Sequence, residues 1–121
     1  KQAKEENMHF EAIFYQKEDG TEPAKEFVLG LDTHMRAKML RAIVMLQDLG
    51  YDLREPYSKP IGDGIFELRA RAGTNISRVL YFFVVGQRAV LTNGFIKKTQ
   101  KTPEKEYRKD YLLRRDENGK K

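Results

Sequence analysis

The chain has 121 residues, 40% of them hydrophobic and 34% charged, which is enough for one domain with a single core, and it has no apolar run near the roughly 20 residues of a membrane span. It contains no cysteine and only two, well-separated histidines, which excludes disulfides, thiolate ligands and cysteine nucleophiles, so we expect no metal or other cofactor. The net charge of +5 comes from the second part of the chain. Residues 1–68 hold 9 Lys/Arg against 13 Asp/Glu, whereas residues 69–121 hold 14 Lys/Arg against 5 Asp/Glu. This excess of positive charge indicates a polyanionic partner.

We expect one folded domain with a short extension at each end. Residues 1–8 form a polar leader without a part in the fold, residues 9–116 form the domain, and residues 117–121 form a basic tail. No internal repeat or Pro/Gly/Ser-rich linker divides the domain. The leader lacks the apolar segment of a signal peptide, so we expect a cytoplasmic protein without a membrane partner.

The first part of the domain predicts a strand and two helices. The aromatic and branched residues of His9–Tyr15 predict a strand. Thr21 is predicted to cap a short helix that has a proline in its first turn. Asp32 or Thr33 is predicted to cap a longer helix, whose apolar side chains recur every three or four residues until Gly50 ends it.

The second part predicts a loop, three strands and a last helix. The prolines and glycines of Tyr51–Gly64 indicate a loop, and Pro103 opens a helix that runs to about Arg115. Compact turns separate the three predicted strands, which are Ile65–Arg71, Ile76–Val85 and Arg88–Phe95. The order β-α-α-β-β-β-α predicts an α+β fold, with a mainly antiparallel, twisted sheet and the helices packed on one face.

Alternation along the strands predicts which side chains share a face. The residues expected under the helices are Phe66, Leu68 and Ala70. On the opposite, open face we expect Glu67, Arg69 and Arg71, with Arg78 of the next strand beside them. Glu67 can neutralise one of these arginines, but an exposed pair stabilises by only about 0–1 kcal/mol and does not explain why Arg78 lies in an apolar strand.

Three lysines crowd the stretch from Gly94 to Pro103. Lys97, Lys98 and Lys101 follow the last strand, at the edge where the arginines gather. Because like charges repel, such crowding indicates an anionic partner. The sequence therefore predicts a concave sheet face that carries arginines and is rimmed by lysines.

Three segments resemble a known family of toxins. The segments "IFELRAR", "SRVLYFF" and "GFIKKTQKTP" resemble the RelE/HigB group of type II toxin–antitoxin toxins, especially its phage-related HigB-like branch, and the similarity covers nearly the whole chain. The resemblance implies a RelE-like fold and a metal-independent endoribonuclease, an mRNA interferase that cuts mRNA on the translating ribosome. It also implies a cognate helix-turn-helix antitoxin, with operator DNA bound only through the toxin–antitoxin complex.

The resemblance also implies site residues. By position, the implied catalytic residues are Arg69, Arg78, Lys97 and Lys98. Arg71 and Lys101 are implied as RNA-binding supporters. Many relatives have histidine where this chain has Asn93, which leaves proton transfer to the lysines.

These residue types suit RNA cleavage without a metal. The 2′-hydroxyl attacks the adjacent phosphorus, and charge builds on the phosphate oxygens in the transition state. Arginine binds two phosphate oxygens at once, so we expect Arg78 and Arg69 to hold the scissile phosphate. A lysine crowded by like charges holds its proton less tightly, so Lys97 or Lys98 is expected to act as general base or acid.

Two aromatic residues are further site candidates, and three alternatives to a nuclease stay open. Phe95 is a candidate for stacking an unpaired base and Tyr107 for acid/base catalysis, although core packing suits both residues better. The alternatives are a ParE-like toxin that inhibits DNA gyrase, a non-catalytic module that binds RNA or ribosomes, and a silent phage remnant. A ParE-like toxin would not need the arginine–lysine cluster.

Overall fold

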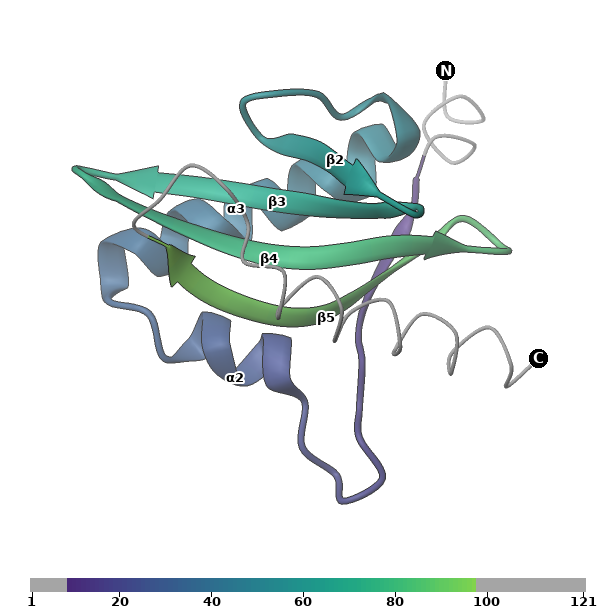
Figure 1. Cartoon of the computed structure of the whole chain (residues 1–121), viewed down its shortest axis with the longest axis horizontal. Coiled ribbons are helices and arrows are strands. Elements are labelled where there is room, and N and C mark those ends of the chain that lie inside the picture. The colour runs from purple at the N-terminus through teal and green to yellow at the C-terminus, as the bar shows by residue number, and fades with distance from the viewer. Residues whose placement is uncertain (1–8, 98–121) are drawn as a thin grey trace.

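The computed structural model describes residues 9–97, which form one twisted sheet with two α-helices on one face (Figure 1). The elements are β1 (Glu11–Phe14), α2 (Pro23–Leu29), α3 (Thr33–Leu49), the short 3-10 helix η1 (Gly50–Asp52), β2 (Ser58–Gly62), β3 (Ile65–Ala72), β4 (Asn75–Val84) and β5 (Arg88–Lys97). The strand order is β1-β5-β4-β3-β2, with β1 parallel to β5 and the other pairs antiparallel. The predicted α+β class and mainly antiparallel sheet are confirmed for this part of the chain.

The segment predicted as a loop contains a strand. β2 pairs antiparallel with Ile65–Leu68 of β3, so the prediction of a loop over Tyr51–Gly64 is wrong and the sheet has one strand more than expected. Proline indicated a loop, but an edge strand tolerates a residue such as Pro60 because only one side of that strand joins the ladder. The hydroxyl groups of Ser58 and Tyr81 share a hydrogen bond of 2.5 Å beneath β3, which ties β2 to β4.

The caps of the long helix are as predicted, and the cap of the short one is not. The Asp32 side chain accepts a hydrogen bond of 2.9 Å from a backbone N–H in the first turn of α3, and Gly50 ends that helix with a φ of 52°. Thr21 does not cap α2. Glu22 takes the cap position without a side-chain bond, and the Thr21 hydroxyl instead bonds to the Asp19 carboxylate at 2.8 Å.

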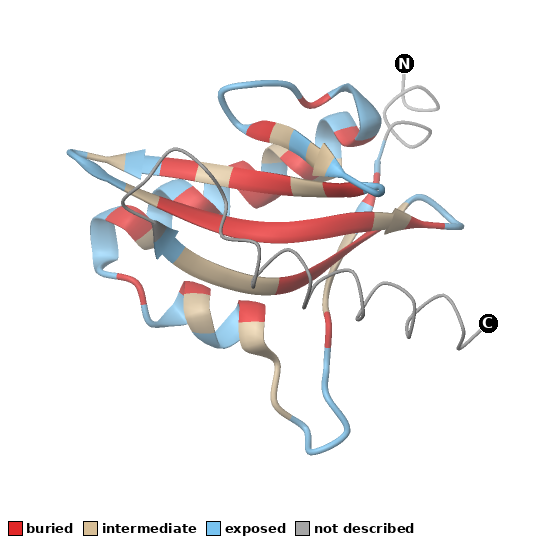
Figure 2. Ribbon diagram, in the orientation of Figure 1, coloured by how far each residue is buried: buried red, intermediate tan, exposed pale blue. Residues whose placement is uncertain are grey.

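The core lies between the sheet and the two helices. Phe66, Leu68 and Ala70 of β3 pack there, as the alternation predicted, against the apolar stripe of α3. β4 is buried along most of its length (Figure 2). Among residues 9–97, no helix is long and apolar enough to span a membrane.

Candidate functional site

The register of the sheet brings the predicted site residues to one end of it. Arg69 in β3 lies opposite Arg78 in β4, and Arg78 lies opposite Phe95 in β5. The next row on the same face runs from Arg71 in β3 to the position of Lys97 in β5. Residues directly opposite each other share a face with Cβ atoms about 4.5–5.5 Å apart, so these rows form one cluster rather than separate surfaces.

The other predicted site residues lie outside the described side chains. Lys98, Lys101 and Tyr107 lie outside residues 9–97, as does the predicted last helix. For Lys97, only the backbone is described. Their roles therefore remain predictions.

A pocket of about 390 Å³ opens at this end of the sheet, beside the part of β3 that β2 does not pair with. Its cationic side chains are Lys38 and Arg41 from α3 and Arg69, Arg71 and Arg78 from the sheet. The other lining residues are Ala42, Met45, Pro56, Tyr57, Ala70 and Ile76. None of the described residues that line the pocket is acidic, so its lining favours an anionic ligand.

The contributions of Lys38, Arg41 and Tyr57 to the pocket were missed from the sequence. A signal was present for the first two, because Lys38, Arg41 and Met45 are three and four residues apart and therefore share one flank of a helix. The spacing does not say which strands that flank meets. Tyr57 had no such signal, since it lies in the segment that was predicted as a loop.

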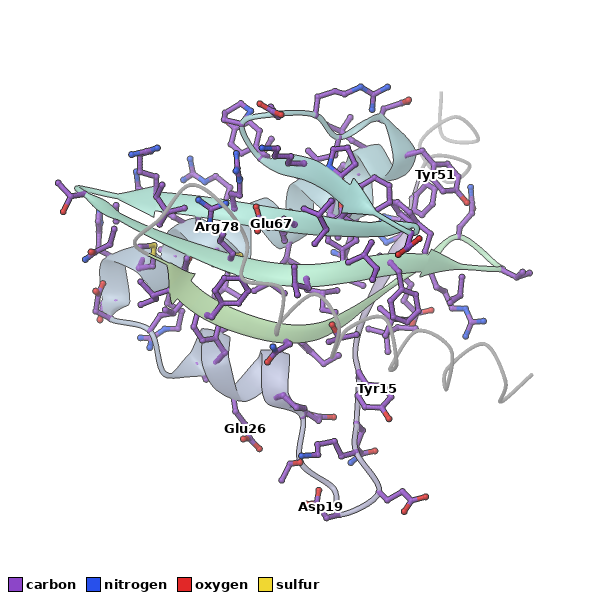
Figure 3. All side chains as sticks on the ribbon, in the orientation of Figure 1. Tyr15, Asp19, Glu26, Tyr51, Glu67 and Arg78 are labelled. Atoms are coloured by element: carbon purple, nitrogen blue, oxygen red, sulfur yellow. The ribbon has the colours of Figure 1, made fainter. Side chains whose placement is uncertain are left out.

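Arg78 is buried, not exposed on an open face as predicted, and it is paired with a buried carboxylate. Arg78 and Glu67 are each only 1% exposed. Nη1 of Arg78 donates to Oε1 of Glu67 at 2.5 Å, and the two side chains lie next to each other in Figure 3. Nε of Arg69 donates to the same oxygen at 3.2 Å. Glu67 thus pairs with two arginines, where the sequence suggested one.

The shared carboxylate has an electrostatic reason. The two guanidinium groups touch one oxygen, so their bonded nitrogens lie within about 6 Å of each other. At an effective dielectric constant of about 20, two like charges about 6 Å apart repel by about 3 kcal/mol. The negative charge of Glu67 offsets this repulsion and fixes both guanidinium groups in position.

One edge of the Arg78 guanidinium is not used by Glu67. The bond to Glu67 employs Nη1, whereas Nε is buried and has no hydrogen-bond partner among the described residues. Nε and Nη2 form the edge of the guanidinium that binds two phosphate oxygens in parallel. A buried donor without a partner costs about 1–3 kcal/mol, so Nε is the atom of Arg78 that gains most from an anionic ligand.

The fold and the pocket define a class of protein: a small basic α+β domain, consistent with a RelE-like fold, that gathers cations at one end of its sheet. The family described as phage derived protein Gp49-like (DUF891) matches residues 26–110, and the chain belongs to this family. It is a toxin–antitoxin toxin family of the RelE/HigB type. A comparison with the curated proteins finds no match.

Proposed function

We propose that the chain is a type II toxin that cuts mRNA as a metal-independent endoribonuclease, on the translating ribosome, and that a cognate antitoxin neutralises it. The family supports the toxin class and the expectation of an antitoxin. The observation that carries the nuclease proposal is the buried Nε of Arg78, which has no partner among the described residues, in a pocket lined by cations.

In this proposal, Arg78 and Arg69 bind the phosphate at the point of cleavage. The Nε–Nη2 edge of Arg78 takes two phosphate oxygens, and Glu67 holds the guanidinium through Nη1 so that it does not have to reorganise. The charge on the phosphate oxygens grows as the 2′-oxygen attacks, so cations placed beforehand stabilise the transition state more than the ground state.

Two protons must move during the reaction. One leaves the 2′-hydroxyl and another reaches the departing 5′-oxygen. We assign these transfers to Lys97 and Lys98, without fixing which lysine is the base. The reason is that β5 pairs with β4 and ends at Lys97, two residues after the position opposite Arg78.

The test is a cleavage assay with the full chain, ribosomes and mRNA in the presence of EDTA, in which the cut ends are mapped. We expect cleavage by the native chain and a loss of about 100- to 1000-fold in Arg78→Ala, since one transition-state donor is removed. RNA that is bound but not cut would instead indicate a non-catalytic binding module. Growth inhibition that acts through DNA gyrase would indicate a ParE-like toxin.

Folding must be checked separately, because Arg78→Ala leaves a buried carboxylate short of a partner, which costs about 3–5 kcal/mol. Arg69→Ala is the second variant, since the Arg69 side chain is 19% exposed and its loss leaves the Glu67–Arg78 bond in place. Arg88→Ala is the control, because the Arg88 Nε bonds to the Val85 carbonyl in the turn before β5. Full cleavage by folded Arg78→Ala and Arg69→Ala would remove both arginines from the site.

A further inference from the structure

The chemistry proposed above uses the sheet side of the pocket and leaves the α3 side without a role. We propose that this side is a subsite for one unpaired nucleotide of the RNA, next to the scissile phosphate: Tyr57 stacks its base, and Lys38 and Arg41 bind its phosphate. The subsite rests on the proposed function and specifies its substrate as single-stranded RNA.

The two α3 cations fit a phosphate. Lys38 and Arg41 are three residues apart on α3, so they are neighbours on the helix surface. Neither takes part in an ion pair with any other described residue, and no described acidic residue lines the pocket beside them. Two adjacent cations without a local counter-charge gain most from a ligand that is itself anionic.

The rest of the α3 side fits a base. Tyr57 is 42% exposed, and Met45 and Pro56 line the pocket with it. Apolar side chains offer a phosphate group no hydrogen bond or opposite charge. The flat face of a base, in contrast, stacks on an aromatic ring and is stabilised by burial against apolar atoms. The pocket volume of about 390 Å³ lies in the usual range for small-ligand sites.

The position of the pocket explains how one strand reaches both sides. β2 pairs with β3 only as far as Leu68, and just beyond it the backbone N–H of Arg69 donates to the Tyr57 carbonyl at 2.8 Å. From Ala70 to Arg71 no described strand pairs with this edge of β3, which lies between the α3 side and the sheet side of the pocket. A single RNA strand laid across this edge places one phosphate at Arg78 and a neighbouring one at Arg41. A duplex could not, because its bases are already stacked and paired. An acidic peptide matches the cations but has no flat base for Tyr57.

The test measures binding apart from cleavage. The full chain is titrated into a short fluorescein-labelled single strand of 2′-O-methyl RNA, which has no 2′-hydroxyl to attack, and anisotropy is recorded at several salt concentrations. Tyr57→Ala should weaken Kd by about 5- to 100-fold with an unchanged salt slope, and Tyr57→Phe should recover most of that loss. Lys38→Ala and Arg41→Ala should each reduce the salt slope by about 0.7, the value for one phosphate contact on a single strand.

Lys25→Ala on α2 is the matched control, because Lys25 is exposed and pairs with Glu22 at 3.5 Å, away from the pocket. Binding by Tyr57→Ala as tight as that of the native chain would overturn the subsite, as would equal competition by duplex RNA or poly-glutamate. The two proposals fail separately. If the chain binds RNA in a Tyr57-dependent way but never cuts it, only the nuclease proposal is contradicted. If the chain cuts RNA and Tyr57→Ala binds as tightly as the native chain, only the subsite is contradicted.

Discussion

Glu67 illustrates how one residue organises the candidate site. Its carboxylate is buried on the face of β3 that carries the arginines, and a single oxygen accepts from both Arg69 and Arg78. A carboxylate beside an anion-binding pocket lowers the affinity for anions, so its contribution must lie elsewhere. It keeps two repelling guanidinium groups in one arrangement and leaves Nε of Arg78 without a partner among the described residues.

The variant Glu67→Gln separates charge from position. Removing the negative charge should leave RNA affinity equal or higher at low salt, while kcat falls because a neutral acceptor holds Arg78 less firmly than a carboxylate does. Glutamine keeps one acceptor for the two arginines, so we expect a stability loss of roughly 1–3 kcal/mol rather than unfolding. Anisotropy and single-turnover cleavage measure the two effects. Weaker binding together with unchanged kcat would contradict a positioning role for Glu67.

At the scale of the elements, α2 lies across β5 because β5 has a glycine at the crossing. A Cβ atom added to Gly94 would lie 2.2 Å from Cδ2 of Phe27, well inside any allowed contact. The ring of Phe27 therefore occupies the space that a side chain would need. Gly94 is directly before Phe95, which lies opposite Arg78, so this packing also fixes the strand at the candidate site.

Gly94→Ala should destabilise the domain by about 1–3 kcal/mol through overpacking. The second variant Phe27→Leu creates room, so Gly94→Ala/Phe27→Leu should lose less than the sum of the single losses. Urea unfolding of the four proteins gives this coupling free energy. Simple additivity would show that Gly94 and Phe27 do not press on each other in the folded chain.

At the scale of the whole molecule, stability depends on the aromatic centre of the sheet. Tyr81 is 1% exposed, stacks on Phe66 with ring centroids 5.4 Å apart and meets Phe83 edge-on at 5.6 Å. Burial raises the pKa of Tyr81 to about 12, although the hydrogen bond that it shares with Ser58 lowers the pKa. Burial therefore disfavours the phenolate form of Tyr81 in the folded chain.

The raised pKa makes stability fall in alkaline solution. Above a pH of about 10 the unfolded chain releases the Tyr81 proton and the folded chain keeps it until about 12, so the unfolded state binds fewer protons and is favoured. The loss through Tyr81 should reach roughly 2–3 kcal/mol across this window. Urea unfolding from neutral pH to pH 12 should show this loss in the native chain and not in Tyr81→Phe. Tyr51→Phe is the control, because Tyr51 is 62% exposed, and its stability should follow that of the native chain at every pH. Equal pH profiles for the native chain and Tyr81→Phe would show that Tyr81 does not cause the alkaline loss of stability.

Local patterns predicted most of the elements of residues 9–97. The alternation in β3, the Asp32 cap and the Gly50 end of α3 each depend on neighbours within a few residues, so the sequence contains the whole signal. β2 was missed because its pairing with β3 is what makes it a strand. Its prolines and glycines by themselves indicate a loop.

The sequence by itself predicted that arginines from two adjacent strands share one face, because side chains alternate along each strand and a short turn joins the two strands, and the register of β3 and β4 agrees. It also determined the excess of positive charge and, through the resemblance, the toxin class that the Gp49-like family supports. Only the tertiary structure decided that Arg78 is buried on Glu67 and that α3 adds Lys38 and Arg41 to the same pocket. Burial and the docking of a helix flank depend on contacts between distant segments, and no spacing along the chain encodes these contacts.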